Sequence, residues 1–115
     1  MTLRECYAAL GGDYEGVMTR LMTEKLVHKF VLKFLDDGSF QNLKNDMAAE
    51  RYEDAFREAH TMKGVCLNLG FTRLFESSSE ITEALRGGNT AKAAELMPLV
   101  EADYMQTVSA IKQLG

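Results

Sequence analysis

Apolar residues recur along most of this chain at alternating steps of three and four positions, which is the spacing of one face of an α-helix. The clearest stripe lies between residues 52 and 69 and consists of Ala55, Ala59, Met62, Cys66 and Leu69. Two more stripes, largely apolar, run through Phe71, Leu74, Ser78, Ile81 and Leu85 and through Ala93, Met97, Tyr104, Val108 and Ile111. Each stripe predicts a helix that packs one face against a core.

The first half of the chain predicts further helices. Thr2 can cap a short first helix, and Asp13 can cap a longer one that continues to about Asp36. The longer helix has an apolar face formed by Leu26, Val27, Phe30, Val31 and Phe34. Asp37-Gly38 should interrupt it, after which Ser39 can cap the next helix.

A glycine and the one proline shape the later helices. Gly70 is expected to end the helix of residues 52–69, and so short a connection makes the next helix fold back antiparallel. Pro98 should kink the last helix rather than end it, because the apolar stripe resumes in phase beyond it. The predicted fold class is all-α: an antiparallel up-and-down four-helix bundle with an additional short N-terminal helix, its four segments spanning residues 24–48, 52–69, 71–87 and 90–114.

Composition narrows the class of protein. A chain of 115 residues can form one domain, here residues 1–115, that buries a core without metal or disulfide support. A net charge of -4 and an isoelectric point near 5.2 argue against nucleic-acid binding. Cys6 and Cys66 are expected to be free thiols. No apolar run approaches the roughly 20 residues of a membrane span, and no signal-peptide pattern opens the chain, so we expect a cytoplasmic protein without membrane contact.

One helix face carries residues that suit chemistry better than packing. At about 100° per residue, His60 lies opposite the apolar stripe of its helix and faces solvent. Gly64 should cost the helix roughly 1 kcal/mol relative to alanine, and at i+4 from His60 it leaves room for another molecule beside the imidazole. Lys63, at i+3, can hold an anion attached to the ring and favours the neutral imidazole. Together these residues describe a phosphoryl acceptor.

The same residues carry a resemblance to a known family. His60-Thr61-Met62-Lys63-Gly64 resembles the His-x-x-Lys-Gly signature of histidine-containing phosphotransfer (Hpt) domains, and Gly11-Gly12-Asp13 resembles the Gly-Gly-Asp near the start of that family. The chain departs from the family at Met62, where leucine is common, and at Ile81-Thr82, where Leu-Glu is common. The resemblance implies a helical bundle that acts in two-component signal transduction.

The resemblance implies that His60 carries a phosphoryl group in a phosphorelay, to or from response-regulator receiver domains, or from a sensor histidine kinase of the simple or hybrid type. Phe56, Leu67 and Arg57 are expected to dock the partner, and Ser79 and Thr82 to lie beside the acceptor on the next helix. The protein is expected to be a monomer that needs no cofactor or metal ion.

Two absences and two alternatives bear on this hypothesis. The chain has no Gly-rich phosphate loop and no carboxylate cluster at metal-ligand spacing, so a donor must bring its own catalytic machinery and the protein is a carrier rather than an enzyme. One alternative is an interaction bundle, a degenerate Hpt domain or an adaptor, in which His60 is incidental. The other is a four-helix metal or cofactor protein, for which Arg57-Glu58-Ala59-His60 supplies no matching ligand pair.

Overall fold

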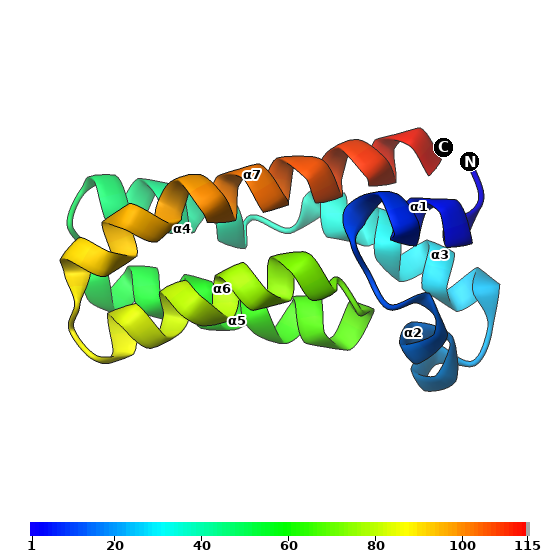
Figure 1. Cartoon of the computed structure of the whole chain (residues 1–115), viewed down its shortest axis with the longest axis horizontal. Helices are drawn as coiled ribbons and strands as arrows, with labels where there is room; N and C mark the ends of the chain where they lie inside the picture. The colour runs from blue at the N-terminus through cyan, green and yellow to red at the C-terminus, as the bar shows by residue number, and fades with distance from the viewer. Residues whose placement is uncertain (115) are drawn as a thin grey trace.

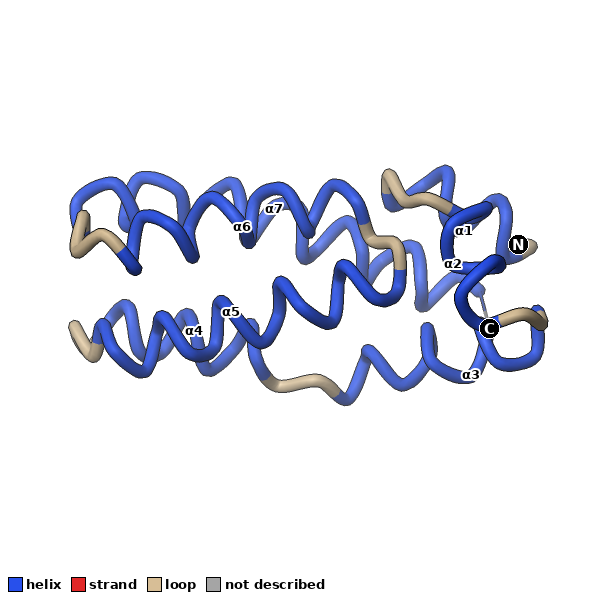
Figure 2. The backbone as a smooth tube through the Cα atoms, turned by 90° about the horizontal axis from the view of Figure 1, so that it is seen from below, coloured by secondary structure: helices blue, strands red, loops and turns tan. Residues whose placement is uncertain are grey.

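Four helical segments run side by side and antiparallel in a computed structural model, which describes residues 1–114 (Figure 1). The first segment is broken and consists of α3 (Glu24–Lys33), the 3-10 turn η1 (Phe34–Asp36) and α4 (Ser39–Ala48). The other three are α5 (Tyr52–Leu69), α6 (Thr72–Arg86) and α7 (Thr90–Leu114), joined by short connections (Figure 2). The predicted all-α bundle is confirmed, and residues 1–114 include no strand.

Two short helices, α1 (Leu3–Leu10) and α2 (Tyr14–Leu21), precede the bundle and lie at one end of it (Figure 1). Thr2 caps α1 as predicted, because its hydroxyl accepts from the Glu5 backbone while the Glu5 carboxylate accepts from the Thr2 backbone. Asp13 caps α2 through the backbone N–H of Gly16. The N-terminal structure is therefore a pair of helices, one more than the fold class predicted.

The long helix expected from Asp13 to about Asp36 is wrong, because the chain breaks at Met22 and Thr23. Met22 adopts a left-handed φ of 75°, and the Thr23 hydroxyl accepts from the backbone N–H of Leu26 to begin α3. The expected cap at Ser39 is also displaced: Ser39 is already helical, and its backbone N–H donates to Oδ1 of Asp37 at 2.9 Å.

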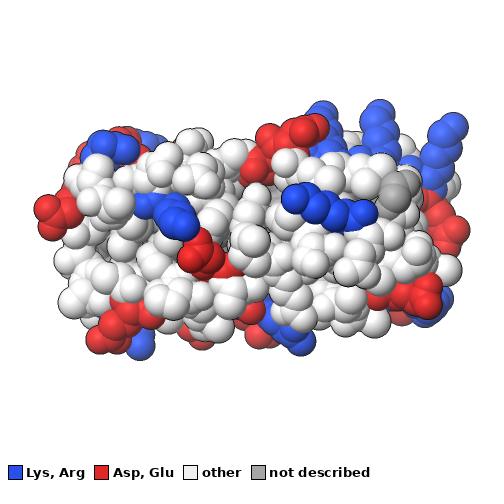
Figure 3. Space-filling model, turned by 90° about the horizontal axis from the view of Figure 1, so that it is seen from above, with Lys and Arg blue, Asp and Glu red and all other residues white. Residues whose placement is uncertain are grey.

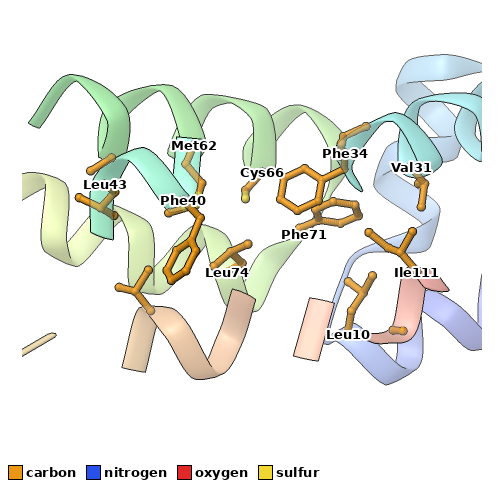
Figure 4. Packing of buried hydrophobic residues seen from close by; sticks show 14 of the residues in the cluster. Leu10, Val31, Phe34, Phe40, Leu43, Met62, Cys66, Phe71, Leu74 and Ile111 are labelled. Atoms are coloured by element: carbon orange, nitrogen blue, oxygen red, sulfur yellow. The ribbon is translucent and has the colours of Figure 1, made fainter. Parts of the chain in front are cut away.

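The core lies between the four segments, and the α5 stripe enters it as predicted. All five residues of that stripe are buried, as are the five of the α6 stripe. Figure 4 shows Phe34, Cys66 and Phe71 pointing toward one another, and the two phenyl rings meet edge to face with centroids 5.2 Å apart. Cys66 and Cys6 are free thiols in this core, as expected, and burial raises the pKa of each.

Two apolar faces differ from the prediction. On α3, Leu26 and Phe30 are exposed, and the buried positions are Val27 and Val31. On α7 the buried stripe includes polar side chains and consists of Ala93, Leu96, Val100, Asp103, Thr107, Ala110 and Ile111. The expected core residues Met97, Tyr104 and Val108 are only half-buried. The helix continues through Pro98.

Candidate functional site

His60 lies in the middle of α5 on its solvent face. Ala59 and Met62, its neighbours on the buried stripe, are fully inaccessible and fix the rotation of the helix about its axis. The side chain of His60 is therefore turned outward and exposed, as predicted. A rigid, well-packed helix presents the imidazole to the surroundings of the protein.

Gly64 leaves open space one turn beyond His60. A methyl group at this position would meet nothing within 4 Å beyond the backbone of its own helix. The glycine lies inside α5 and away from both ends, where it costs about 1 kcal/mol relative to alanine. Neither a close backbone approach nor a left-handed φ explains it. Gly64 therefore leaves the space next to His60 unfilled.

Lys63 follows His60 by three residues on the same helix and is half-buried. Within residues 1–114 its ammonium group has no hydrogen bond or ion pair, whereas nearby Arg57 is paired with Asp54. An unpaired ammonium group on a flexible stem can turn toward an anion on the adjacent ring. Arg57 is exposed and lies one turn before His60.

A groove of about 920 Å³ opens beside His60. His60, Thr61 and Gly64 form one edge of it, and much of the remaining wall is apolar. The other lining residues come from α2, α3, η1, the loop after η1 and the end of α5: Arg20, Leu21, Phe30, Lys33, Phe34, Asp37, Val65, Leu67, Asn68 and Leu69. Leu67, a predicted docking residue, is 57% exposed at this groove. Lys and Arg side chains gather at the end of the molecule where α1 to α3 lie (Figure 3).

The end of α5 nearest this groove is held by the N-terminal helices. Nε and Nη2 of Arg20 donate to the carbonyl oxygens of Asn68 and Leu67, each at 3.0 Å. The Tyr7 hydroxyl donates to the carbonyl oxygen of Leu69 at 2.6 Å, and burial raises its pKa. The Leu67 carbonyl also accepts from the backbone N–H of Gly70 at 3.3 Å. The last carbonyls of a helix lack intrahelical partners, so α1 and α2 supply donors to this helix end.

Phe56, predicted as an exposed docking residue, is half-buried and lies beside His60. Its ring centroid lies 5.9 Å from that of the His60 imidazole, with the planes 24° apart. The guanidinium of Arg86, at the end of α6, lies over the phenyl ring with Cζ 5.0 Å from its centroid. Sequence reasoning missed Arg86, because no spacing rule links it to a residue on another helix.

The two expected neighbours on α6, Thr82 and Ser79, both have buried hydroxyl groups. Thr82 is fully buried, and its hydroxyl donates to the carbonyl oxygen of Ser78 at 2.6 Å within its own helix. Ser79 lines a shallow depression between α6 and α7 with Glu83 and Leu96, and no residue of α5 takes part in that lining.

Neither a candidate metal cluster nor a membrane-spanning helix occurs among residues 1–114. No group of three or more His, Cys, Asp or Glu side chains among residues 1–114 could hold a metal ion. No helix there combines the length and apolar character of a membrane span.

A comparison with known families completes the assignment. The family model described as Hpt domain matches residues 33–113, a range that contains His60, Lys63 and Gly64. No curated protein and no solved structure matches the chain. Hpt domains are phosphotransfer carriers that interact with response regulators and kinases of two-component systems. Because the matched range is most of the chain and the structure is a bundle with an outward His, this chain belongs to the Hpt domain family.

Proposed function

We propose that this protein is a histidine phosphotransfer protein of a multistep phosphorelay, with His60 as the residue that carries the phosphoryl group. The observation that carries the proposal is the open side of His60: an exposed imidazole, a buried stripe behind it, and empty space at Gly64. An incidental surface histidine has no need of a glycine at i+4 that costs helix stability.

The transfer step needs only one nucleophile from this chain. The lone pair of a neutral imidazole nitrogen attacks the phosphorus of an aspartyl phosphate, the new N–P bond forms, and the P–O bond breaks to return a free carboxylate. The ring keeps its second N–H and carries a positive charge, and the reverse reaction regenerates the neutral imidazole. Lys63 supports the phosphoryl group by charge, while the partner supplies any catalytic ion.

The partner is a receiver domain, with or without a sensor histidine kinase as the original donor. Leu67 and Arg57 are the proposed docking residues, since both are exposed on the helix that carries His60. We propose that the protein acts as a cytoplasmic monomer, is not an enzyme, and needs neither cofactor nor nucleic acid.

The test is transfer from a phosphorylated receiver domain, followed by intact mass measurement and by the acid lability of the phosphate. Wild type should gain one phosphoryl group and give it back, whereas His60→Gln should stay folded and unlabelled. His28→Gln, which removes the other histidine, is the matched control and should transfer like wild type. Acetyl phosphate alone should label the chain poorly, because the chain brings no machinery of its own.

One result would favour a bundle that only binds partners. The apolar groove beside His60 could bind another protein without any chemistry. If wild type binds a panel of phosphorylated receivers yet never gains phosphate, the interaction function replaces the carrier function. Labelling of His60→Gln would instead place the acceptor elsewhere.

A further inference from the structure

The side chain of His60 has an aromatic neighbour on one side and open space on the other. Side chains on an α-helix lean toward its N-terminus, so the imidazole leans toward residue 56, one turn earlier. There the phenyl ring of Phe56 lies nearly parallel to it, with 5.9 Å between centroids and 24° between planes. On the other side Gly64 offers no side chain at all. The exposed imidazole thus has an aromatic neighbour toward the N-terminus of α5 and open space toward its C-terminus.

The Phe56 ring is itself held in place by the neighbouring helix α6. Arg86 lies over the Phe56 ring at 5.0 Å, and its Nε lies 3.2 Å from both carboxylate oxygens of Glu83. Leu85 and Tyr52 line the same depression as Phe56. The phenyl ring is thus half-buried at the contact of α5 with α6, and a cation–π contact restrains it. A side chain held in this way is poorly suited to adapt to a docking partner.

We propose that Phe56 is a positioning residue for phosphoryl transfer: it fixes the plane of the His60 imidazole, and with it the direction of the ring edge that bears the reacting nitrogen, while Gly64 leaves room for the incoming partner and Arg86 holds Phe56 in place. The inference rests on the proposed function of His60 as acceptor. The N–P bond forms in the plane of the imidazole, and transfer requires the nitrogen, the phosphorus and the leaving oxygen to lie in line. Rotation of a free imidazole would move the nitrogen out of that line, so a stacked ring shortens the search for the reactive geometry.

A positioning role and a docking role predict different effects of a substitution on the transfer kinetics. A residue that orients the nucleophile changes the maximal transfer rate, whereas a residue that binds the partner in both ground and transition state changes the half-saturating concentration. The chain offers one residue for each role on the same helix. Phe56 is half-buried against His60, and Leu67 is exposed at the groove.

The experiment measures transfer from a phosphorylated receiver domain across a range of receiver concentrations. Phe56→Leu keeps an apolar side chain but removes the flat ring, and it should lower the maximal rate roughly two- to tenfold, the factor that corresponds to ordering one side chain. The half-saturating concentration should change by less than about twofold. Phe56→Tyr should restore the rate, and Arg86→Gln should lower it in the same direction by a smaller factor. Leu67→Ala, the contrast, should raise the half-saturating concentration instead.

A second readout follows the imidazole itself. Proton NMR should show the His60 ring signals displaced by the phenyl ring current in wild type and in Phe56→Tyr, and the displacement lost in Phe56→Leu. Arg86 is an exposed side chain, so Arg86→Gln keeps the test valid if Phe56→Leu unfolds.

Four outcomes decide the matter. A reduced rate with lost ring-current displacement supports the positioning role. A raised half-saturating concentration in Phe56→Leu, or no change at all in a folded Phe56→Leu or Arg86→Gln, overturns it and leaves His60 as acceptor. Failure of wild type to take a phosphoryl group overturns the proposed function and this role with it, even if the NMR displacement is present.

Discussion

Replacing Gly64 by alanine should make this protein more stable and slower at the same time. The position is inside α5, its φ is not in the left-handed region, and an added methyl group meets nothing within 4 Å beyond its own helix. Alanine therefore gains helix propensity and loses unfolded-chain entropy without steric cost, a stabilisation of about 0.4 to 1 kcal/mol.

This free energy translates into a measurable melting shift. An unfolding entropy of roughly 2.1 cal/mol/K per residue over 115 residues means that 1 kcal/mol raises Tm by about 4 °C. Gly64→Ala should accordingly melt about 2 to 4 °C above wild type in a calorimetric or circular dichroism scan. The linear denaturant slope should stay the same, because the change exposes no additional surface on unfolding.

The functional cost grows with the size of the side chain. One methyl group at i+4 narrows the open side of His60, so Gly64→Ala should transfer a few times more slowly. Gly64→Gln fills that side, and it should stay folded yet scarcely transfer. The melting scan and the transfer assay are run on the same samples, so that loss of transfer is separated from loss of structure.

Gly88 is the matched control for the stability half of this prediction. It has equally open surroundings, but its φ is 73°, a conformation that strains any residue with a side chain. Gly88→Ala should therefore lower Tm and leave transfer unchanged. A lower Tm in Gly64→Ala would show that this glycine is retained for packing or backbone reasons, and full transfer by Gly64→Gln would refute its role in access.

Three further predictions concern charge, a buried hydrogen bond and pH. Lys63→Ala should shorten the lifetime of phosphohistidine or slow transfer while the denaturant midpoint changes little, since its half-buried ammonium makes no ion pair within residues 1–114; identical lifetimes would exclude a role in charge support. Tyr7→Phe should lower the free energy of unfolding by about 1 to 3 kcal/mol in urea titrations, because the buried carbonyl of Leu69 loses its donor; a neutral result would mean that water replaces the hydroxyl. Burial raises the pKa of the Cys66 thiol, so the folded state keeps a proton that the unfolded state releases above about pH 8.5, and stability should fall as pH rises beyond that value. Cys66→Ala should flatten this decline, and an equally steep one would assign it to other groups.

The buried face of a helix was predicted correctly where every position of its periodic stripe is apolar. The α5 stripe contains only apolar residues, so its face was placed correctly, and the outward direction of His60 followed from it. On α7 the buried face contains Asp103 and Thr107, and the Thr107 hydroxyl donates to the carbonyl of Asp103 within the helix. Because the Thr107 hydroxyl is hydrogen-bonded within its own helix, this polar side chain can be buried. The buried face therefore does not follow the apolar pattern, and the predicted stripe was displaced by about one residue.

Other features depend on contacts that periodicity does not encode. The break after α2 requires Met22 to take a left-handed φ, which a methionine gives no reason to expect. The contact of Arg86 with Phe56 joins two helices through side-chain conformations rather than through spacing. Family resemblance placed Thr82 and Ser79 beside His60, whereas the Thr82 hydroxyl is hydrogen-bonded within α6 and the Ser79 hydroxyl is buried without a hydrogen-bond partner among residues 1–114.

The hydrogen bonds from Tyr7 and Arg20 to the end of α5 come from outside the range that the family model matches. Residues 33–113 match the family, yet the donors that complete the helix carrying His60 come from residues before that range. A fragment cut at the edges of the match would leave those helix-end carbonyls to water and expose the face that α1 covers on α7. The matched range is thus shorter than the range whose contacts complete the end of α5 and cover α7, and a transplant of this module into another protein should carry the first two helices with it.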